Sequence, residues 1–327
     1  MKKRKILYGF ALLSFSAVFI FTSCKKKEDP ITETPTTPAT TVPDGQSGTD
    51  SREVTGENDN STSEVNDALS NAARIGGKGE TTSATTGICG YDIDSVKITH
   101  DTILLKYNGV TCANRTRTGI IRLSWAHGTK WKNIGAVIKI DYINYKITRA
   151  SDQRSMMFNG TQNLTNVSGG NWINLLTTAN YNLINTVTGT NLNIQFEDGK
   201  TAVYNINRRI TYTYPGAFPN GILTVKAEGI GTSGTTSNLE NFGTARNGDV
   251  FTSQVTTPIM WNVTCAGAVL QGGVTVTNVT KNFNLKFTYG VDVNGNPQTV
   301  AANSCPYGWK LEWTANSISN SKVFGYN

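Results

Sequence analysis

The feature that most constrains the fold is an alternation of apolar and polar residues with a period of two. It begins near Ile88 and continues to the end of the chain. One example is the apolar set Ile121, Leu123 and Trp125, which occupies every second position with polar residues between. Comparable runs lie at 191–196, 282–289 and 309–314. Such alternation indicates antiparallel strands with one buried face.

Turn signals separate these runs. Asn-Gly or Asp-Gly pairs lie at residues 108–109, 198–199, 220–221, 247–248 and 294–295. Each pair suits a hairpin that requires a positive φ. No long amphipathic helix is evident after residue 88. The segment 88–327 therefore predicts one all-β domain, an antiparallel meander of roughly a dozen or more strands. A sandwich, a barrel and a single rolled sheet all fit this pattern.

The N-terminus has the composition of an export signal. Residues 2–5 are all basic, and an apolar run from Ile6 to Phe21 follows them. The run is short for a membrane-spanning helix and right for a signal peptide. It ends in Phe21-Thr22-Ser23-Cys24, which resembles the lipobox of bacterial lipoproteins. That resemblance implies cleavage after residue 23 and lipidation of Cys24. The basic-then-acidic segment at 25–29 resembles the signal that sends Bacteroidetes lipoproteins to the outer face of the outer membrane.

The segment after Cys24 is poor in aliphatic residues. Residues 24–61 are rich in Thr, Pro, Ser, Asp and Glu, so we expect a disordered, acidic tether. Residues 62–87 predict a short helix and a linker. Ser63 can cap this helix, Arg74 is its last residue, and Gly76 can end it.

The net charge of +7 is unevenly distributed. Residues 28–87 carry eleven acidic and three basic residues, whereas 88–327 carry twenty basic and twelve acidic residues. A basic domain favours anionic partners such as acidic glycans or lipid headgroups. The other interpretation is a solvated basic surface that the acidic tether partly neutralises. No nucleic-acid partner is expected.

The order of several segments resembles a family of uncharacterised Bacteroidetes secreted β-rich lipoproteins. These segments are 115–121, 135–145, 196–201 and 247–251, followed by the pair Cys265 and Cys305. The resemblance spans about residues 62–327. Its motifs are turns and strand starts, and it implies no activity.

Four cysteines besides Cys24 predict two disulfides in an exported chain. Of the three connectivities, we favour Cys89–Cys112 and Cys265–Cys305, because each pair encloses only one or two hairpins. A pairing of Cys89 with Cys305 would instead require the first and last strands to meet.

Catalytic signatures are absent from the sequence. His100 and His127, its two histidines, lie at a turn and in a loop, and we expect both to be surface residues. A carboxylate-dependent glycoside hydrolase would need two carboxylates across one groove, and Asp141 and Glu312 are the candidate pair. We predict that the chain is not an enzyme.

Binding signals are weak. Trp131 and Trp172 lie beside Lys and Asn, where exposed rings could stack on sugars. Asp292-Val293-Asn294-Gly295 faintly resembles a calcium loop, but an Asn-Gly turn is the better interpretation. No metal site and no cofactor are predicted. The partners expected are a membrane, through the lipid, and glycans or other anionic polymers.

Overall fold

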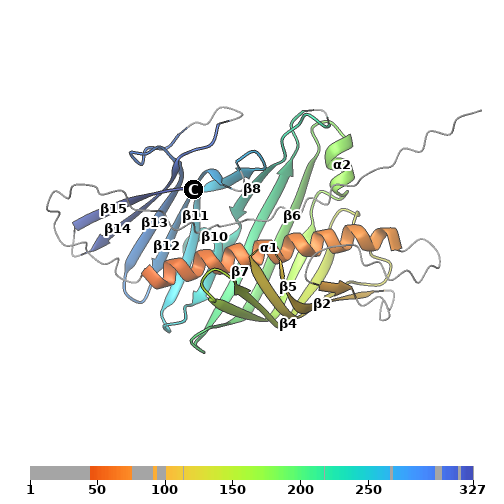
Figure 1. Cartoon of the computed structure of the whole chain (residues 1–327), viewed down its shortest axis with the longest axis horizontal. Coiled ribbons are helices and arrows are strands. Elements are labelled where there is room, and N and C mark those ends of the chain that lie inside the picture. The colour runs from red at the N-terminus through yellow and green to blue at the C-terminus, as the bar shows by residue number, and fades with distance from the viewer. Residues whose placement is uncertain are drawn as a thin grey trace, which may run out of the picture.

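The computed structural model describes residues 45–75, 91–93, 101–112, 114–216, 218–265, 268–298, 304–315 and 318–326. These residues form one long helix, one short helix and a single antiparallel sheet (Figure 1). The helices are α1 (Gly45–Ile75) and α2 (Trp172–Thr177). The first strands are β1 (Tyr91–Ile93), β2 (Thr102–Cys112), β3 (Arg115–Ser124), β4 (Ala136–Arg149), β5 (Ser155–Asn166), β6 (Asn182–Phe196) and β7 (Thr201–Thr213). The others are β8 (Thr224–Gly229), β9 (Gly231–Ser233), β10 (Thr236–Thr244), β11 (Val250–Asn262), β12 (Val269–Asn278), β13 (Phe283–Val291), β14 (Gly308–Ala315) and β15 (Ile318–Gly325).

The sheet is a meander with one local departure. Its strand order is β1-β2-β3-β4-β5-β6-β7-β10-β11-β12-β13-β14-β15. Strand β8 pairs with β7 and β11, and β9 pairs with β10. The space between β7 and β11 is therefore shared by β10 at one end and β8 at the other. The predicted antiparallel all-β meander is confirmed. In the described part of the chain it is one open sheet, not two packed sheets.

Helix α1 crosses one face of this sheet (Figure 1). A Cβ added at Gly48 would meet Leu285 of β13, while Glu64 bonds Tyr107 of β2, so the helix reaches from β13 to β2. A helix of 31 residues is about 46 Å long, which suits this span. The prediction of a tether through residue 61 is therefore wrong for residues 45–61. The short helix predicted at 63–74 is the C-terminal part of α1.

The buried stripe of α1 explains the error. Its buried residues follow a helical spacing, but among those whose burial the structure describes only Val54, Val65, Ala68 and Leu69 have apolar side chains. The other buried positions among them are Ser47, Gly48, Asp50, Ser51, Thr55, Glu57, Asn58, Ser61, Thr62 and Asn66. Burial of a polar stripe requires polar partners on the sheet. The face of the sheet toward α1 must therefore be polar in places.

The apolar core lies on the same face. The largest fully buried side chains include Tyr145, Tyr204, Phe158 and Phe251, in strands β4 to β11. Tyr204 and Phe251 contact each other across the sheet, with ring centroids 4.8 Å apart. This apolar band and the polar stripe of α1 together position the helix.

The cysteines agree with part of the predicted pairing. Cys265 and Cys305 form a disulfide with Cα atoms 5.5 Å apart, as predicted. Cys112 is also disulfide-bonded. Cys89, its predicted partner, and Cys24 lie outside the described residues. The bond between Cys265 and Cys305 excludes the alternative pairings that joined either of them to Cys89 or Cys112.

The two rims of the sheet differ in loop length. Short turns at 150–154, 197–200, 245–249 and 279–282 form one rim. Longer loops at 125–135 and 167–181, together with the described residues of the connections 214–223, 263–268 and 292–307, form the other, which we call the loop rim. The loop rim contains α2 and lies at the top of Figure 1. No helix in the described part of the chain is long and apolar enough to cross a membrane.

Candidate functional site

Charged side chains join α1 to the sheet, and the acidic partner is nearly always on the helix. Six sheet arginines contact α1, and we call them the arginine face. They are Arg115 (with Glu57, 2.7 Å), Arg117 (Glu64, 3.1 Å), Arg149 (Glu53, 3.2 Å), Arg154 (Glu53, 2.9 Å), Arg208 (Asp59) and Arg246 (Asp50, 2.6 Å). One pair is reversed, because Arg52 of α1 contacts the fully buried Glu240 of β10 at 2.5 Å. The helix therefore neutralises a face of the sheet that is strongly cationic without it.

The tightest of these contacts is between Arg246 and Asp50. The guanidinium donates two hydrogen bonds to the carboxylate, both of 2.6 Å. Its central carbon lies 3.8 Å from the ring centroid of Phe196. Asp50 is fully buried, and only 8% of the Arg246 side chain is exposed. A bidentate, stacked and desolvated arginine of this kind fixes the position of the first turns of α1.

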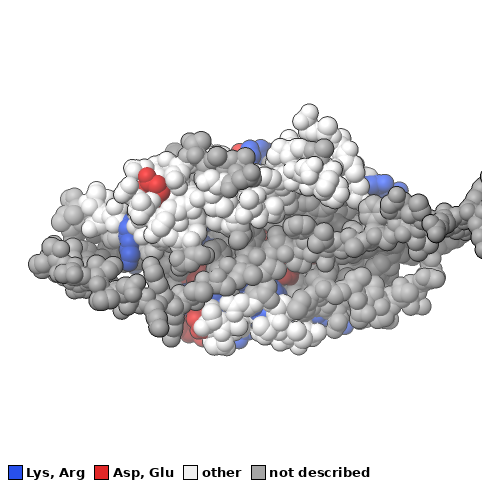
Figure 2. Space-filling model, turned by 45° about the horizontal axis from the view of Figure 1, so that its top comes forward, with Lys and Arg blue, Asp and Glu red and all other residues white. Residues whose placement is uncertain are grey.

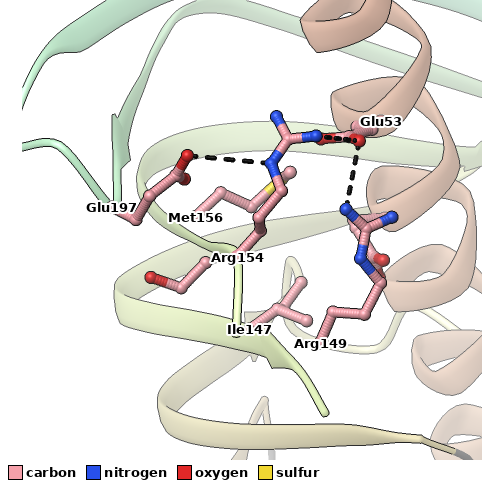
Figure 3. Close-up of a pocket in the computed structure, with 8 residues that line it drawn as sticks. Glu53, Ile147, Arg149, Arg154, Met156 and Glu197 are labelled. Carbon is pink, nitrogen blue, oxygen red and sulfur yellow. Dashed lines mark hydrogen bonds and ion pairs between the residues drawn. The ribbon is translucent and has the colours of Figure 1, made fainter. Parts of the chain in front are cut away.

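Figure 3 shows the adjoining gap between α1 and the β4–β5 turn. Arg149 and Arg154 both donate to Glu53, and Arg154 also lies 3.7 Å from Glu197. The gap holds about 20 Å³, which is room for about one water molecule. It is too small for a substrate.

The middle of the interface is held by uncharged polar groups. The Tyr142 hydroxyl accepts a hydrogen bond from Gln162 at 2.6 Å and lies 2.7 Å from the Ser61 hydroxyl. Asn58 donates to Gln162 at 2.9 Å. Nearer the N-terminus, Asn241 of β10 donates to Thr55 at 2.8 Å. These contacts pair Thr55, Asn58 and Ser61 of the polar stripe with the sheet.

Burial also shifts the titration of the helix. It raises the pKa of Glu53, Asp59 and Glu64, and the neighbouring arginines oppose that rise. Burial likewise raises the pKa of Tyr142 and Tyr204 well above the usual range. These groups are enclosed between α1 and the sheet, so their shifts follow from packing and not from an exposed cleft.

The structure does not bring the two candidate carboxylates together. The Tyr142 side chain faces α1, so its neighbour Asp141 lies on the outer face of β4. Glu312 lies between two buried residues of β14, also on the outer face. Eight strand positions separate β4 from β14, about 38 Å along the sheet. The arrangement needed by a glycosidase is absent from this pair.

Both carboxylates are already neutralised. Burial raises the pKa of Asp141, but hydrogen bonds from Thr161, Arg122 and Lys139 lower it overall. Glu312 contacts Lys286 and Lys310, which lower its pKa in the same way. Neither carboxyl group has the raised pKa of a general acid.

The other titratable candidates are surface residues. His127 is exposed and lies 3.2 Å from Asp101. His100 lies outside the described residues. Asp292 accepts backbone hydrogen bonds from Asn294 and Asn296, so this segment is the predicted Asn-Gly turn. No cluster of metal-ligating residues occurs in the described part of the chain.

Trp131 and Trp172 lie on the loop rim. Both are partly buried and pack against the core. Trp172 begins α2 and meets Tyr212 edge to face, with ring centroids 4.8 Å apart. The Trp131 carbonyl accepts a hydrogen bond from the buried Asn166. The two rings are therefore anchors of the rim and do not form a flat stacking platform.

Sequence reasoning missed the arginine face and its partner helix. One signal was available, since Asp50, Glu53, Glu57 and Glu64 follow helical spacing and precede a domain rich in arginine. Comparisons of the chain with protein-family models, with curated proteins and with solved structures found no match.

Proposed function

We propose that this chain is a lipid-anchored protein of the outer-membrane surface whose β domain is non-catalytic and has a structural or ligand-binding role. The observation that carries the proposal is that α1 covers the arginine face. A face that is filled by the chain's own helix, with about 20 Å³ left beside it, has no room there for a substrate. The folded unit is then a rigid body on a lipid anchor.

The anchor rests on the sequence. Basic residues 2–5, the apolar run to Phe21 and the small residues before Cys24 resemble a lipoprotein signal, with Phe21 in place of the usual Leu. The resemblance of residues 25–29 to the surface-export signal of Bacteroidetes lipoproteins agrees with this. Stable attachment takes more than one acyl chain, and the multiple acyl chains of a lipidated N-terminal cysteine meet that need.

Two alternatives have less support. Six of the twenty basic residues after residue 88 are paired with α1, which weakens the argument from charge for an anionic polymer on the sheet. The hydrolase required Asp141 and Glu312 in one groove, and they lie eight strands apart.

Metabolic labelling with palmitate tests the anchor in cells that express the full chain. We expect label in the wild type and in Ser23→Ala, which keeps a small residue before the cysteine. We expect no label in Cys24→Ala, together with loss of cleavage. Protease treatment of intact cells then tests surface display. Equal labelling of Cys24→Ala and the wild type would refute the anchor.

A further inference from the structure

The two rims of the sheet differ sharply in charge. The four turns at 150–154, 197–200, 245–249 and 279–282 are short but carry eight charged residues. The five loops of the loop rim are longer and carry only three, Lys130, Lys132 and Asp292, and Asp101, which precedes β2 at the same rim, adds one more. The loops 167–181, 214–223 and 263–268 carry none. In Figure 2, where this rim is turned forward, most of the described surface is uncharged.

The loop rim also collects the exposed apolar side chains. Fourteen large apolar residues are exposed in the described part of the chain. Eight of them lie in the five rim loops, namely Ile134, Val167, Ile173, Leu176, Phe218, Val263, Val293 and Tyr307. Ile134, Phe218 and Val293 are 79%, 64% and 64% exposed, respectively. Single exposed apolar residues are ordinary, but a majority gathered on one rim marks a candidate surface for contact with a membrane or another protein.

Aromatic rings support these tips from behind. Trp125, Trp131, Trp172, Tyr181 and Tyr214 lie in the same loops, are partly buried and pack against the core. Asn171 caps α2 with its side chain, so that Ile173 projects from a rigid turn. Trp131 lies between the exposed Lys130 and Lys132. Apolar tips, a layer of Trp and Tyr, and flanking lysines are the combination found at membrane interfaces.

We propose that the loop rim docks on the interface of a lipid bilayer, with the apolar tips among the acyl chains and Lys130 and Lys132 at anionic headgroups. Other occupants fit less well. A glycan platform needs exposed ring faces, whereas the rim tryptophans are packed and its tips are mostly aliphatic. The charged opposite rim is unsuited to the same phase. This docking is separate from the lipid on Cys24 and is independent of it.

The predicted anchor allows both contacts at one membrane. Twenty residues separate Cys24 from Gly45, and an extended chain of that length spans at most about 70 Å. The docked rim would hold the arginine face and its helix at a fixed height above the bilayer.

Vesicle binding tests the proposal without the anchor. The chain from Lys25 onward lacks the signal segment and Cys24 but retains every described element. It is incubated with vesicles of phosphatidylethanolamine and phosphatidylglycerol and sedimented. We expect co-sedimentation and a blue shift of tryptophan fluorescence. Ile134→Glu/Ile173→Glu should bind at least about tenfold more weakly, because two exposed isoleucines no longer enter the acyl region.

A matched control carries the same two charges elsewhere. Val250→Glu/Val279→Glu alters exposed valines, 49% and 52% exposed, at the opposite rim, and should bind like the wild type. Equal urea midpoints for all three proteins show that the fold is unchanged. Lys130→Ala/Lys132→Ala should weaken binding to anionic vesicles only.

Several results would overturn the proposal. The first is a wild-type protein that does not bind vesicles, and the second is an equal loss of vesicle binding in both double-glutamate variants. The third is a dimer that depends on the rim residues, seen by analytical ultracentrifugation, in a protein that does not bind vesicles. Rim-dependent binding on a glycan array, again without vesicle binding, would assign the rim to sugars. Because the protein tested has no lipid, failure of the anchor at Cys24 would not affect this result.

Discussion

Loss of the Arg246 guanidinium should destabilise the protein far more than loss of an outer-face arginine. In Arg246→Met the aliphatic stem is kept, but Asp50 loses both of its 2.6 Å hydrogen bonds from the guanidinium. The nearest other cation is Arg154, 3.8 Å away. Asp50 is fully buried, so its charge cannot be hydrated in place.

The magnitude follows from this burial. At about 4 Å and an effective dielectric constant of about 20, two unit charges attract by about 4 kcal/mol. Breaking a buried pair by removal of one partner costs about 3–5 kcal/mol where the other charge is left unpaired. Asp50 keeps Arg154 at 3.8 Å and a hydrogen bond from Gln46 at 2.6 Å, so we expect a loss of about 3 kcal/mol, at the lower end of this range. Asp50→Asn should cost less, about 1.5–3 kcal/mol, because Arg246 keeps Glu197 at 3.4 Å and Asp198 at 3.6 Å. The double variant should cost less than the sum by about 1–3 kcal/mol.

Urea unfolding of the unlipidated chain at pH 7, followed by tryptophan fluorescence, measures these free energies. Hydrogen exchange of the α1 amides shows whether the helix loosens first. Arg122→Met is the matched control, because Arg122 pairs with Asp141 but is 46% exposed, and it should cost no more than about 1 kcal/mol. If the free-energy losses of the two single variants at Asp50 and Arg246 summed to that of the double variant within about 0.5 kcal/mol, the two side chains would not be coupled. Their ion pair would then not hold α1, and our interpretation of the arginine face would be wrong.

Two further changes test the sheet. Asp141→Asn should lower the free energy of unfolding by about 1–2 kcal/mol at pH 7. Because the pKa of Asp141 in the folded protein lies below its ordinary value, this difference should vanish as the pH falls below about 4. Urea midpoints of both proteins at several pH values measure it. A difference that grew in acid would contradict the assigned shift. Gly119→Ala should lower the free energy of unfolding by roughly 2–4 kcal/mol, because φ is +92° and a Cβ would lie 2.1 Å from the Asn144 carbonyl oxygen. Gly199→Ala is the control: its φ is +80° but its Cβ would enter open space, so the loss should be roughly 1–2 kcal/mol. Equal decreases in melting temperature would refute the predicted clash.

The strands could be predicted because each buries one face. Runs such as the one through Ile121 and Leu123 alternate cleanly, and the Asn-Gly and Asp-Gly pairs mark turns that the structure confirms at Gly199, Gly248 and Gly295. The turn predicted at residues 108–109 is wrong, because this pair lies inside β2 at a shift in its register with β3. Local pairing also made the bond between Cys265 and Cys305 predictable. The choice of a single curled sheet over a sandwich could not be made, because alternation gives each residue's face and does not tell which element covers that face.

Helix α1 was missed because apolar periodicity is the usual signal of a helix, and its buried stripe is mostly Ser, Thr, Asn and acid. Intrinsic propensity also argued against it, with Gly45, Gly48 and Gly56 inside its bounds. Such a helix is stable only against a partner that supplies the polar contacts, and most helix stability in proteins comes from packing.

The uneven distribution of charge along the chain was nevertheless a signal for the contact between α1 and the arginine face. A net-acidic segment before a net-basic domain admitted two interpretations, an external anionic partner or neutralisation by the chain itself. The ion pairs from Asp50 to Glu64 support the second for the arginine face. Neutralisation by α1 does not explain the composition of the loop rim. Its large exposed side chains are apolar, and its loops are nearly free of charge. The chain covers its own cationic face and leaves exposed a rim with few charges and many aromatic residues, so we expect an external partner to bind at that rim.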